Sequence, residues 1–151
     1  MKTRMLSGSV LAFIGDAILS LKVRDFLVKK GYTKAKDLQE KSIIFVGAKG
    51  QAKFMHYLID ENVLSEDEMY IYKRGRNANM GSTAKNVDVV SYRVASGLEA
   101  LLGFLYYEDQ KRLDEIFNMM LEFFKEEFNW DLKEDKLWHN IYTEKTLLKI
   151  D

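Results

Sequence analysis

Two isolated carboxylates are the side chains of this 151-residue sequence best placed to do chemistry. Asp16 lies between Gly15 and Ala17 in the most apolar stretch of the chain, and Glu99 lies among the small and apolar residues of 95–103. A carboxylate is costly to bury unless it is paired or bound to a metal ion. Each of these acids therefore needs a reason for its position.

One such reason is a shared metal site. Small residues around both acids would let two helices pack closely and bring Asp16 and Glu99 together. Two carboxylates from facing helices suit Mg²⁺, which keeps several waters and takes phosphate oxygens as its remaining ligands. The alternative is that Asp16 points to solvent from a narrow polar strip of its helix, and the sequence leaves both interpretations open.

The composition excludes most other catalytic chemistry. The chain has no cysteine and only two histidines, His56 and His139, which excludes disulfide scaffolds, thiolate zinc sites, cysteine nucleophiles and multi-histidine metal sites. Any metal ion must therefore be held by oxygen. No uncharged apolar run reaches the roughly 18 residues of a membrane span, so we expect a cytoplasmic protein without a membrane segment or a cleaved signal.

The net charge of zero conceals an uneven distribution of charge. Residues 1–93 carry 16 basic and 10 acidic side chains, whereas residues 94–151 carry 7 and 13, so the two parts have net charges of +6 and −6. Such segregation can create a positive face of the kind that phosphate backbones require. The alternative is that the lysines are simply solvated on helix surfaces.

A glycine-containing basic segment spans residues 73–83. Five residues separate Gly75 from Gly81, Ser82 rather than a lysine follows, and no strand precedes the segment, so it does not fit a phosphate-binding P-loop. We interpret it as a flexible basic loop that contacts backbone phosphates, with a plain surface loop as the alternative.

Apolar periodicity predicts helices along the chain and favours helix over strand throughout. Ser7 or Ser9 caps the first helix and Gly31 ends it, whereas a capping box from Ser65 to Glu68 begins another. The expected helices cover residues 9–30, about 33–40, 42–62, 65 into the Arg-Gly-Arg stretch, 88–108 and 110–127, with a polar loop at 77–87.

The helix expected over 42–62 contains Gly47 and Gly50, each of which lowers helix propensity by up to about 1 kcal/mol relative to alanine. We interpret these glycines as positions where another backbone approaches closely. With neither an internal repeat nor a low-complexity linker, the sequence predicts one all-α domain.

Two motifs carry a resemblance to a known family. Residues 13–19, Phe-Ile-Gly-Asp-Ala-Ile-Leu, and residues 98–103, Leu-Glu-Ala-Leu-Leu-Gly, resemble the signature helices E-R-L-E-F-L-G-D and A-D-x-x-E-A-L-I-G of the ribonuclease III catalytic domain. The resemblance covers residues 7–125. It is closer to the short Mini-ribonuclease III branch, whose motifs A-Y-I-G-D-A, A-K-A-Q-A-K and R-R-G-R-N-A are similar to residues 12–17, 48–53 and 73–78.

The resemblance implies a ribonuclease III endonuclease-domain helical fold, with a catalytic domain at residues 1–127 and an acidic C-terminal extension at 128–151. It implies metal-dependent cleavage of double-stranded RNA that leaves 5′-phosphate ends, with Asp16 and Glu99 as catalytic residues and ligands of Mg²⁺, for which Mn²⁺ could substitute. It also implies a homodimer that matures the precursor of 23S ribosomal RNA. The branch lacks a separate RNA-binding domain, so this domain must hold the RNA itself, through Lys49, Lys53, Arg74, Arg76 and Lys85.

The chain departs from the wider family at three positions. Ser9, Ala12 and Ser96 stand where the family has acidic residues, so one or two weakly held ions, completed by water and RNA phosphates, are both compatible with the motif. The alternative function is a non-catalytic RNA-binding or ribosome-assembly protein that retains the fold. The missing acids favour this alternative, whereas the survival of Asp16 and Glu99 favours an enzyme.

Overall fold

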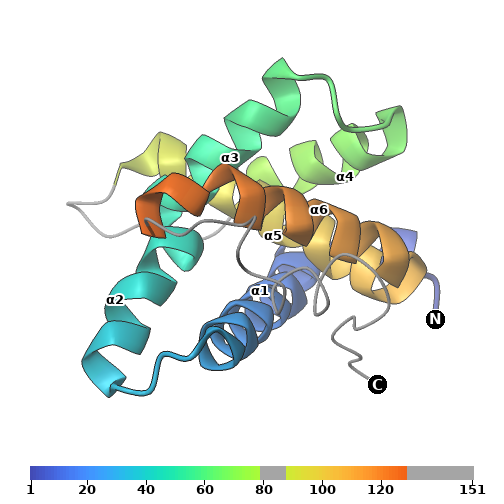
Figure 1. Cartoon of the computed structure of the whole chain (residues 1–151). Helices are drawn as coiled ribbons and strands as arrows, with labels where there is room; N and C mark the ends of the chain where they lie inside the picture. Colours follow the sequence, from blue (N-terminus) through green and yellow to red (C-terminus); the bar gives the residue numbers. More distant parts are fainter. Residues whose placement is uncertain (79–87, 129–151) are drawn as a thin grey trace.

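The computed structural model describes residues 1–78 and 88–128, and within these ranges the only regular structure is helical (Figure 1). The predicted all-α fold is confirmed. None of the described helices is long and apolar enough to cross a membrane. The elements are the 3-10 helix η1 (Thr3–Met5), α1 (Gly8–Lys30), α2 (Ala35–Val46), α3 (Ala48–Asp60), α4 (Glu66–Arg76), α5 (Val89–Glu108), α6 (Gln110–Phe123) and the 3-10 helix η2 (Lys125–Phe128).

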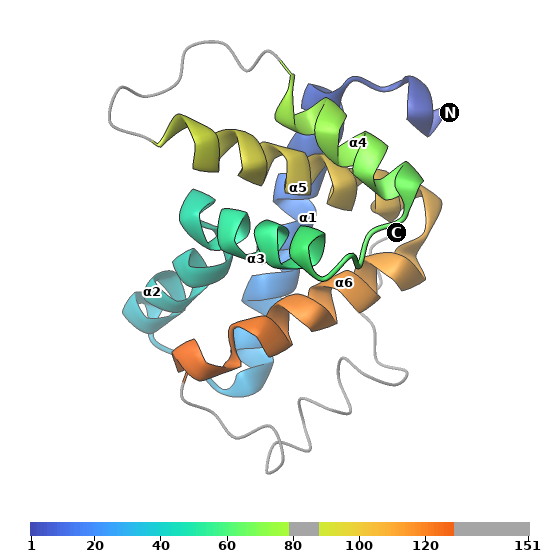
Figure 2. The same cartoon turned by 90° about the horizontal axis from the view of Figure 1, so that it is seen from above.

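Helix α5 is the centre of the fold. It packs most extensively against α1, α4 and α3, and Figure 2 shows it crossing α1 between the other two. Nearly every residue from Val94 to Leu105 is buried, whereas Glu99 is only half-buried. A helix that is apolar on all sides must be surrounded by other elements, which explains why the chain wraps around α5.

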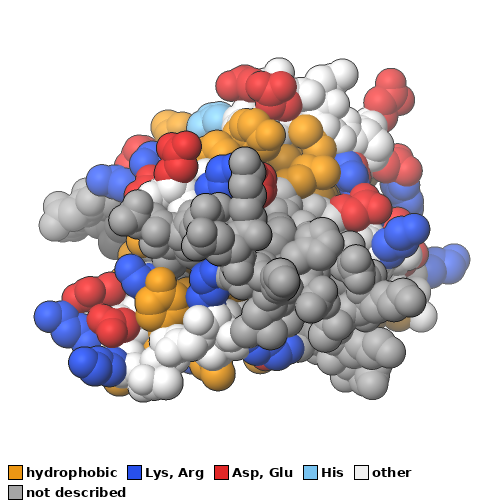
Figure 3. Space-filling view, viewed as in Figure 1, with side chains coloured by type: hydrophobic (Ala, Val, Ile, Leu, Met, Phe, Trp, Pro, Cys, Tyr) orange, Lys and Arg blue, Asp and Glu red, His pale blue; other side chains and the backbone are white. Residues whose placement is uncertain are grey.

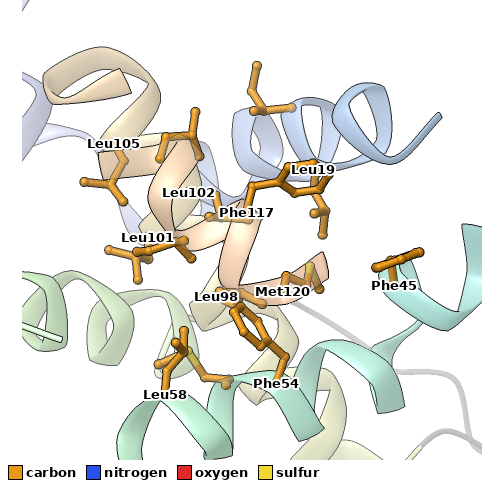
Figure 4. Close-up of a cluster of buried hydrophobic side chains, with 14 of the residues drawn as sticks. Leu19, Phe45, Phe54, Leu58, Leu98, Leu101, Leu102, Leu105, Phe117 and Met120 are labelled. Carbon is orange, nitrogen blue, oxygen red and sulfur yellow. The ribbon is translucent and has the colours of Figure 1, made fainter. Parts of the chain in front are cut away.

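The core lies where α5 meets α3 and α6. Leu98, Leu102, Phe54, Phe117 and Met120 converge there from these three helices and are at most 4% exposed (Figure 4). Burying each such side chain contributes roughly 1.5–3 kcal/mol, so this cluster fixes α3 and α6 on the surface of α5.

The helix ends follow the sequence closely. The Ser7 hydroxyl accepts a hydrogen bond from the backbone N–H of Val10 at 3.2 Å, which settles the choice of cap for α1. Gly31 ends α1 in the left-handed region with φ of 109°, a conformation that glycine adopts without steric cost. Asp88 caps α5 and Asp109 caps α6 through backbone N–H groups of the first turn.

The prediction of a single helix over residues 42–62 is wrong. Helix α2 continues to Val46, Gly47 is extended with ψ of 152°, and a new helix begins at Ala48. A Cβ atom at Gly50 would lie 2.0 Å from the carbonyl oxygen of Ile44. The glycines therefore allow the chain to turn sharply and to pack α3 back against the last turn of α2.

Two other boundaries differ from the prediction. The helix expected over 110–127 ends at Phe123 and is followed by the single turn of η2. The segment interpreted as a basic loop from residue 73 is helical as far as Arg76, which confirms the helix expected to run from Ser65 into the Arg-Gly-Arg stretch. Most of the loop at 77–87, including Lys85, and the extension from residue 129 lie outside the described residues.

A buried ion pair ties α1 to α6. The Lys22 ammonium lies 2.5 Å from Asp114 Oδ1 and 5.7 Å from the centre of the Phe117 ring, and the Lys22 side chain is 2% exposed. Removing one member of such a pair leaves a buried charge without compensation. The pair therefore restricts how α6 can be placed over α1.

A second ion pair ties α4 to α6. Arg112 holds Glu68 with two guanidinium nitrogens, Nε at 2.8 Å and Nη2 at 3.0 Å, and also donates to the carbonyl of Val63. Glu68 closes the predicted capping box by accepting from the backbone of Ser65. Burial alone raises the pKa of Glu68, but the hydrogen bonds from Arg112 and Ser65 outweigh it and hold this pKa below its ordinary value.

We expect the pKa of Glu68 to make stability depend on acid pH. A lowered pKa stabilises the fold above the ordinary value of 4.5, and this contribution disappears as the pH falls through the folded-state pKa. Glu68→Gln should lower the free energy of unfolding at pH 7 by about 2 kcal/mol and flatten its decline below pH 4.5. Urea unfolding across pH 3–7 measures both effects, with the exposed Glu66→Gln as control; identical pH profiles would contradict the prediction.

Candidate active site

Helices α1 and α5 cross in backbone contact. A Cβ atom at Gly15 would lie 1.7 Å from the carbonyl oxygen of Glu99, and one at Gly103 would lie 2.0 Å from that of Leu11. No larger residue fits at these positions without separating the helices. The close approach expected from the small residues is therefore confirmed, and it places the backbone of Glu99 beside Gly15.

The side chains of Asp16 and Glu99 meet at this crossing. The Asp16 carboxyl is close enough to raise the pKa of Glu99 both by its negative charge and as a hydrogen-bonding partner, and Asp16 is exposed whereas Glu99 is half-buried. Asp16 therefore faces solvent, as one interpretation expected, and also lies near Glu99, whereas the shared metal site stays a prediction. The crossing therefore places an exposed carboxyl group, that of Asp16, next to a half-buried one, that of Glu99.

Glu99 titrates far from its ordinary range. Burial, together with the negative charge and hydrogen bonding of Asp16, raises the pKa of Glu99 to about 8, against the opposing effect of a hydrogen bond from Gln51. Two acidic side chains this close repel each other when both are charged, and a bound cation would relieve that repulsion.

Gln51 is a member of this site that sequence reasoning missed. Its side chain, 2% exposed, donates from Nε2 to the Val46 carbonyl at 2.9 Å and to Glu99 Oε2 at 3.2 Å. Its Oε1 is buried without a hydrogen-bond donor from the protein. A signal existed, because position 51 shares the inward face of its helix with Ala48, Ala52, Met55 and Leu58.

The donor set fits a divalent cation with few protein ligands. Ser9, Ala12 and Ser96 have no carboxylate to add to the site. Ser9 is half-buried, and Ala12 and Ser96 are buried. No group of three potential His, Cys, Asp or Glu ligands exists among the described residues. An ion held by Asp16 and Glu99 alone would keep most of its waters, as Mg²⁺ commonly does. The unpaired Oε1 of Gln51 is an acceptor that an ordered water could satisfy.

Comparison with known proteins agrees with this geometry. A family model described as the ribonuclease III domain matches residues 9–110, a range that includes Asp16, Gln51 and Glu99. Mini-ribonuclease 3 of Enterococcus faecalis is 43% identical over 120 residues, covering 79% of this chain and 91% of that protein. The chain belongs to the Mini-ribonuclease 3 branch of the ribonuclease III family.

Further relatives cover the same part of the chain. Mini-ribonuclease 3 of Streptococcus pneumoniae is 41% identical over 119 residues, which are 78% of this chain and 93% of that protein. A crystal structure of a Fusobacterium nucleatum protein has 31% sequence identity and a TM-score of 0.73, and it covers 81% of this chain and 99% of that one. The first comparison supports membership in the family, and the second shows that a solved structure shares this helical fold over most of the chain.

Two of the five basic residues expected to contact RNA are free to do so. Lys49 and Lys53 are exposed on α3, at the edge of a cavity of about 490 Å³ formed by the end of α2, the start of α5 and the end of α6. On the face seen in Figure 3, basic and acidic side chains are interspersed over α2 at the lower left. The described surface in this view is therefore not uniformly basic.

The arginines are placed differently. Arg74 is half-buried and donates to the carbonyls of Arg4, at 2.8 Å, and Leu6, so it holds the N-terminal segment against α4. Arg76 lies over the ring of Tyr72 at 5.6 Å and donates to Asn77. These contacts give both arginines structural partners, and their binding to RNA stays a prediction, as does that of Lys85 outside the described residues.

Proposed function

We propose that this chain is a metal-dependent endoribonuclease that hydrolyses phosphodiester bonds of double-stranded RNA and leaves 5′-phosphate and 3′-hydroxyl ends. Membership in the ribonuclease III family supports RNA cleavage as such. The observation that carries the proposal is the paired carboxyls of Asp16 and Glu99 at the α1–α5 crossing. The chain has no cysteine nucleophile, and His56 is exposed on α3, away from the buried face that carries Gln51.

Asp16 and Glu99 would hold Mg²⁺, or Mn²⁺ in its place. When bound, such an ion lowers the pKa of a water to make it a nucleophile and neutralises charge on the leaving oxygen. The exposed Asp16 carboxylate would hold the ion at the protein surface, where an RNA phosphate can reach it, whereas the half-buried Glu99 is carried by the core helix α5. Together the two ligands would present the ion to the reacting phosphate.

The enzyme is proposed to act as a homodimer. Val10, Phe13 and Leu21 are apolar residues that remain exposed on α1, and the Phe13 side chain is 77% exposed three residues before Asp16. An exposed apolar stripe on a helix is typical of a surface that another protein chain covers. Two copies would supply one site for each strand of a duplex, as the family resemblance implies.

The proposed substrate is a base-paired stem in the precursor of 23S ribosomal RNA, cut in the cytoplasm. Duplex RNA is recognised mainly by its shape, its 2′-hydroxyls and its phosphates. The exposed Lys49 and Lys53 support phosphate contacts near the site, because they lie on α3, the helix whose Gln51 donates a hydrogen bond to Glu99.

We expect Lys49→Ala and Lys53→Ala each to weaken duplex RNA binding and to reduce the slope of log K against log salt by about 0.7–0.9, the effect of one lost phosphate contact. Arg74→Ala should instead lower the melting temperature, because it releases the carbonyls of Arg4 and Leu6. Salt titrations with an uncleaved duplex, in a Glu99→Gln background, separate these effects. Unchanged slopes for both lysine variants would place the RNA elsewhere.

The decisive test is a cleavage assay on long duplex RNA with Mg²⁺, with single-stranded RNA and duplex DNA of the same sequence as controls. We expect cuts in duplex RNA alone, with product ends that accept ligation as 5′-phosphates, and no cuts in EDTA. The alternative is a non-catalytic RNA-binding or ribosome-assembly protein, which the missing acids at Ser9, Ala12 and Ser96 favour. Tight duplex binding without cleavage, for several structured RNAs and with both Mg²⁺ and Mn²⁺, would support that alternative.

A further inference from the structure

Gln51 is a buried amide with two opposite neighbours. On one side its Nε2 donates to the backbone carbonyl of Val46, and on the other side the same nitrogen donates to Glu99 Oε2. The side chain is 2% exposed, so neither solvent nor an RNA backbone can reach it directly. Any influence of Gln51 on the reaction must therefore pass through Glu99.

The Val46 carbonyl determines which way the amide faces. A backbone carbonyl can only accept hydrogen bonds, so the end of Gln51 that lies against it must be the N–H₂ group. That same group is then directed at Glu99 and presents a donor to it. The amide cannot turn over without placing its own oxygen against the Val46 oxygen, which would bring two acceptors together in a buried place.

The free carbonyl of Val46 exists because the chain breaks between α2 and α3. Val46 is the last residue of α2, and the last carbonyls of a helix have no partner within it. The extended Gly47 starts the new helix at once, and Gln51 lies one turn further on. The close packing of Gly50 on the Ile44 carbonyl fixes α3 at the distance where the Gln51 amide spans Val46 and Glu99.

We infer that Gln51 is a positioning residue that fixes the Glu99 carboxylate as a ligand for the divalent cation, with the end of α2 as its anchor. The amide donates to Oε2 of Glu99, so a cation shared with Asp16 would take the other oxygen of Glu99. This assignment rests on the proposed function, because it deepens the same site. It adds a third residue, from a third helix, to the two carboxylates that the sequence identified as site residues.

Hydrogen bonds of this kind restrict both the rotamer and the charge of a ligand. Outer partners of metal ligands are commonly worth 10–100-fold in metal affinity. Here the protein has only two carboxylates to hold the ion, so the orientation of each one matters more than in a site with four.

The test is the affinity for Mn²⁺, measured from the EPR signal of the free ion without RNA. Gln51→Leu removes the donor with little change of volume, and Gln51→Glu keeps the shape but replaces the donor by an acceptor. We expect both variants to weaken Mn²⁺ binding by about 10-fold or more. Gln39→Leu, at an exposed glutamine of α2, is the matched control and should bind as wild type does.

A second readout separates positioning from stability. With duplex RNA, Gln51→Leu should lower kcat and raise the Mg²⁺ concentration that gives half-maximal rate, with KM for RNA unchanged. Urea unfolding without metal monitors the fold, and Gln51→Met replaces Gln51→Leu if the branched side chain prevents folding.

The outcomes are distinct. Folded Gln51 variants that bind Mn²⁺ as tightly as wild type, while Asp16→Asn and Glu99→Gln lose it, would overturn the role of Gln51 and leave the proposed function standing. If wild type binds no Mn²⁺ and cuts no RNA, the proposed function and the role of Gln51 are both wrong.

Discussion

Glu99→Gln and Asp16→Asn are each expected to abolish RNA cleavage without unfolding the protein. Both substitutions keep the volume of the side chain but remove one of only two carboxylates at the α1–α5 crossing. Loss of a ligand must exceed the 10–100-fold effect of losing an outer partner, so we expect at least a 100-fold loss of rate. Single-turnover cleavage of duplex RNA at several Mg²⁺ concentrations measures it.

The same Glu99→Gln variant should be more stable than wild type when metal is absent. The pKa of Glu99 is raised from 4.5 to about 8, so the folded protein retains a proton that the unfolded chain releases within this range. Stability therefore falls as the pH rises from 4.5 to 8. Glutamine removes this dependence, and its gain at pH 8 in EDTA should be on the order of 2 kcal/mol.

Denaturant unfolding with and without Mg²⁺ provides the check. Mg²⁺ should stabilise wild type by binding only the folded state, and should leave Glu99→Gln unchanged. Glu108→Gln, an exposed position at the end of the same helix, is the control and should behave as wild type. A Glu99→Gln variant that still cleaves RNA, or one that Mg²⁺ still stabilises, would remove Glu99 from the site.

Gly15→Ala is expected to cost about 3 kcal/mol, at the upper end for adding one methyl group to a packed core. The new Cβ atom would lie 1.7 Å from the carbonyl oxygen of Glu99, so α1 and α5 must move apart. Alanine is otherwise the better helix former, which makes a loss of stability a direct sign of the backbone contact. The separation should also move Asp16 away from Glu99 and weaken binding of the cation.

Urea unfolding and Mn²⁺ affinity measure the two effects of Gly15→Ala. Gly31→Ala is the contrasting control, because its Cβ atom meets nothing within 4 Å and only its φ of 109° is unfavourable. That variant should lose roughly 1 kcal/mol and keep its Mn²⁺ affinity. Equal Mn²⁺ affinity in Gly15→Ala and wild type would show that the crossing tolerates movement.

Local signals in the sequence predicted most of the fold. Ser7, Gly31 and the Ser65–Glu68 box mark helix ends because each acts on backbone groups within four residues of itself. The break at Gly47 could not be derived in this way. A glycine within a periodic segment is compatible with a bent helix or with two helices, and the contact that decides is the packing of Gly50 on Ile44.

The candidate site was predictable only where small residues surrounded a charge. Asp16 and Glu99 were recognisable because a carboxylate among glycines and leucines is costly. Gln51 is uncharged and 48 positions from Glu99, so neither its place on an inward helix face nor the motif at 48–53 pointed to this contact. Arg74 was predicted to contact phosphate because it is a basic residue near glycines, and nothing in the sequence indicated that it also donates to carbonyls of the N-terminal segment.

The central position of α5 has a consequence for protein engineering. This helix carries Glu99 and also packs against α1, α3, α4 and α6. A substitution that improves packing along α5 would therefore also shift the proposed metal ligand Glu99. Such a variant would be more thermostable but would have a lower catalytic rate. Variants selected for heat resistance without loss of activity should accumulate changes on the outer surfaces of α2 and α6 and leave α5 almost untouched.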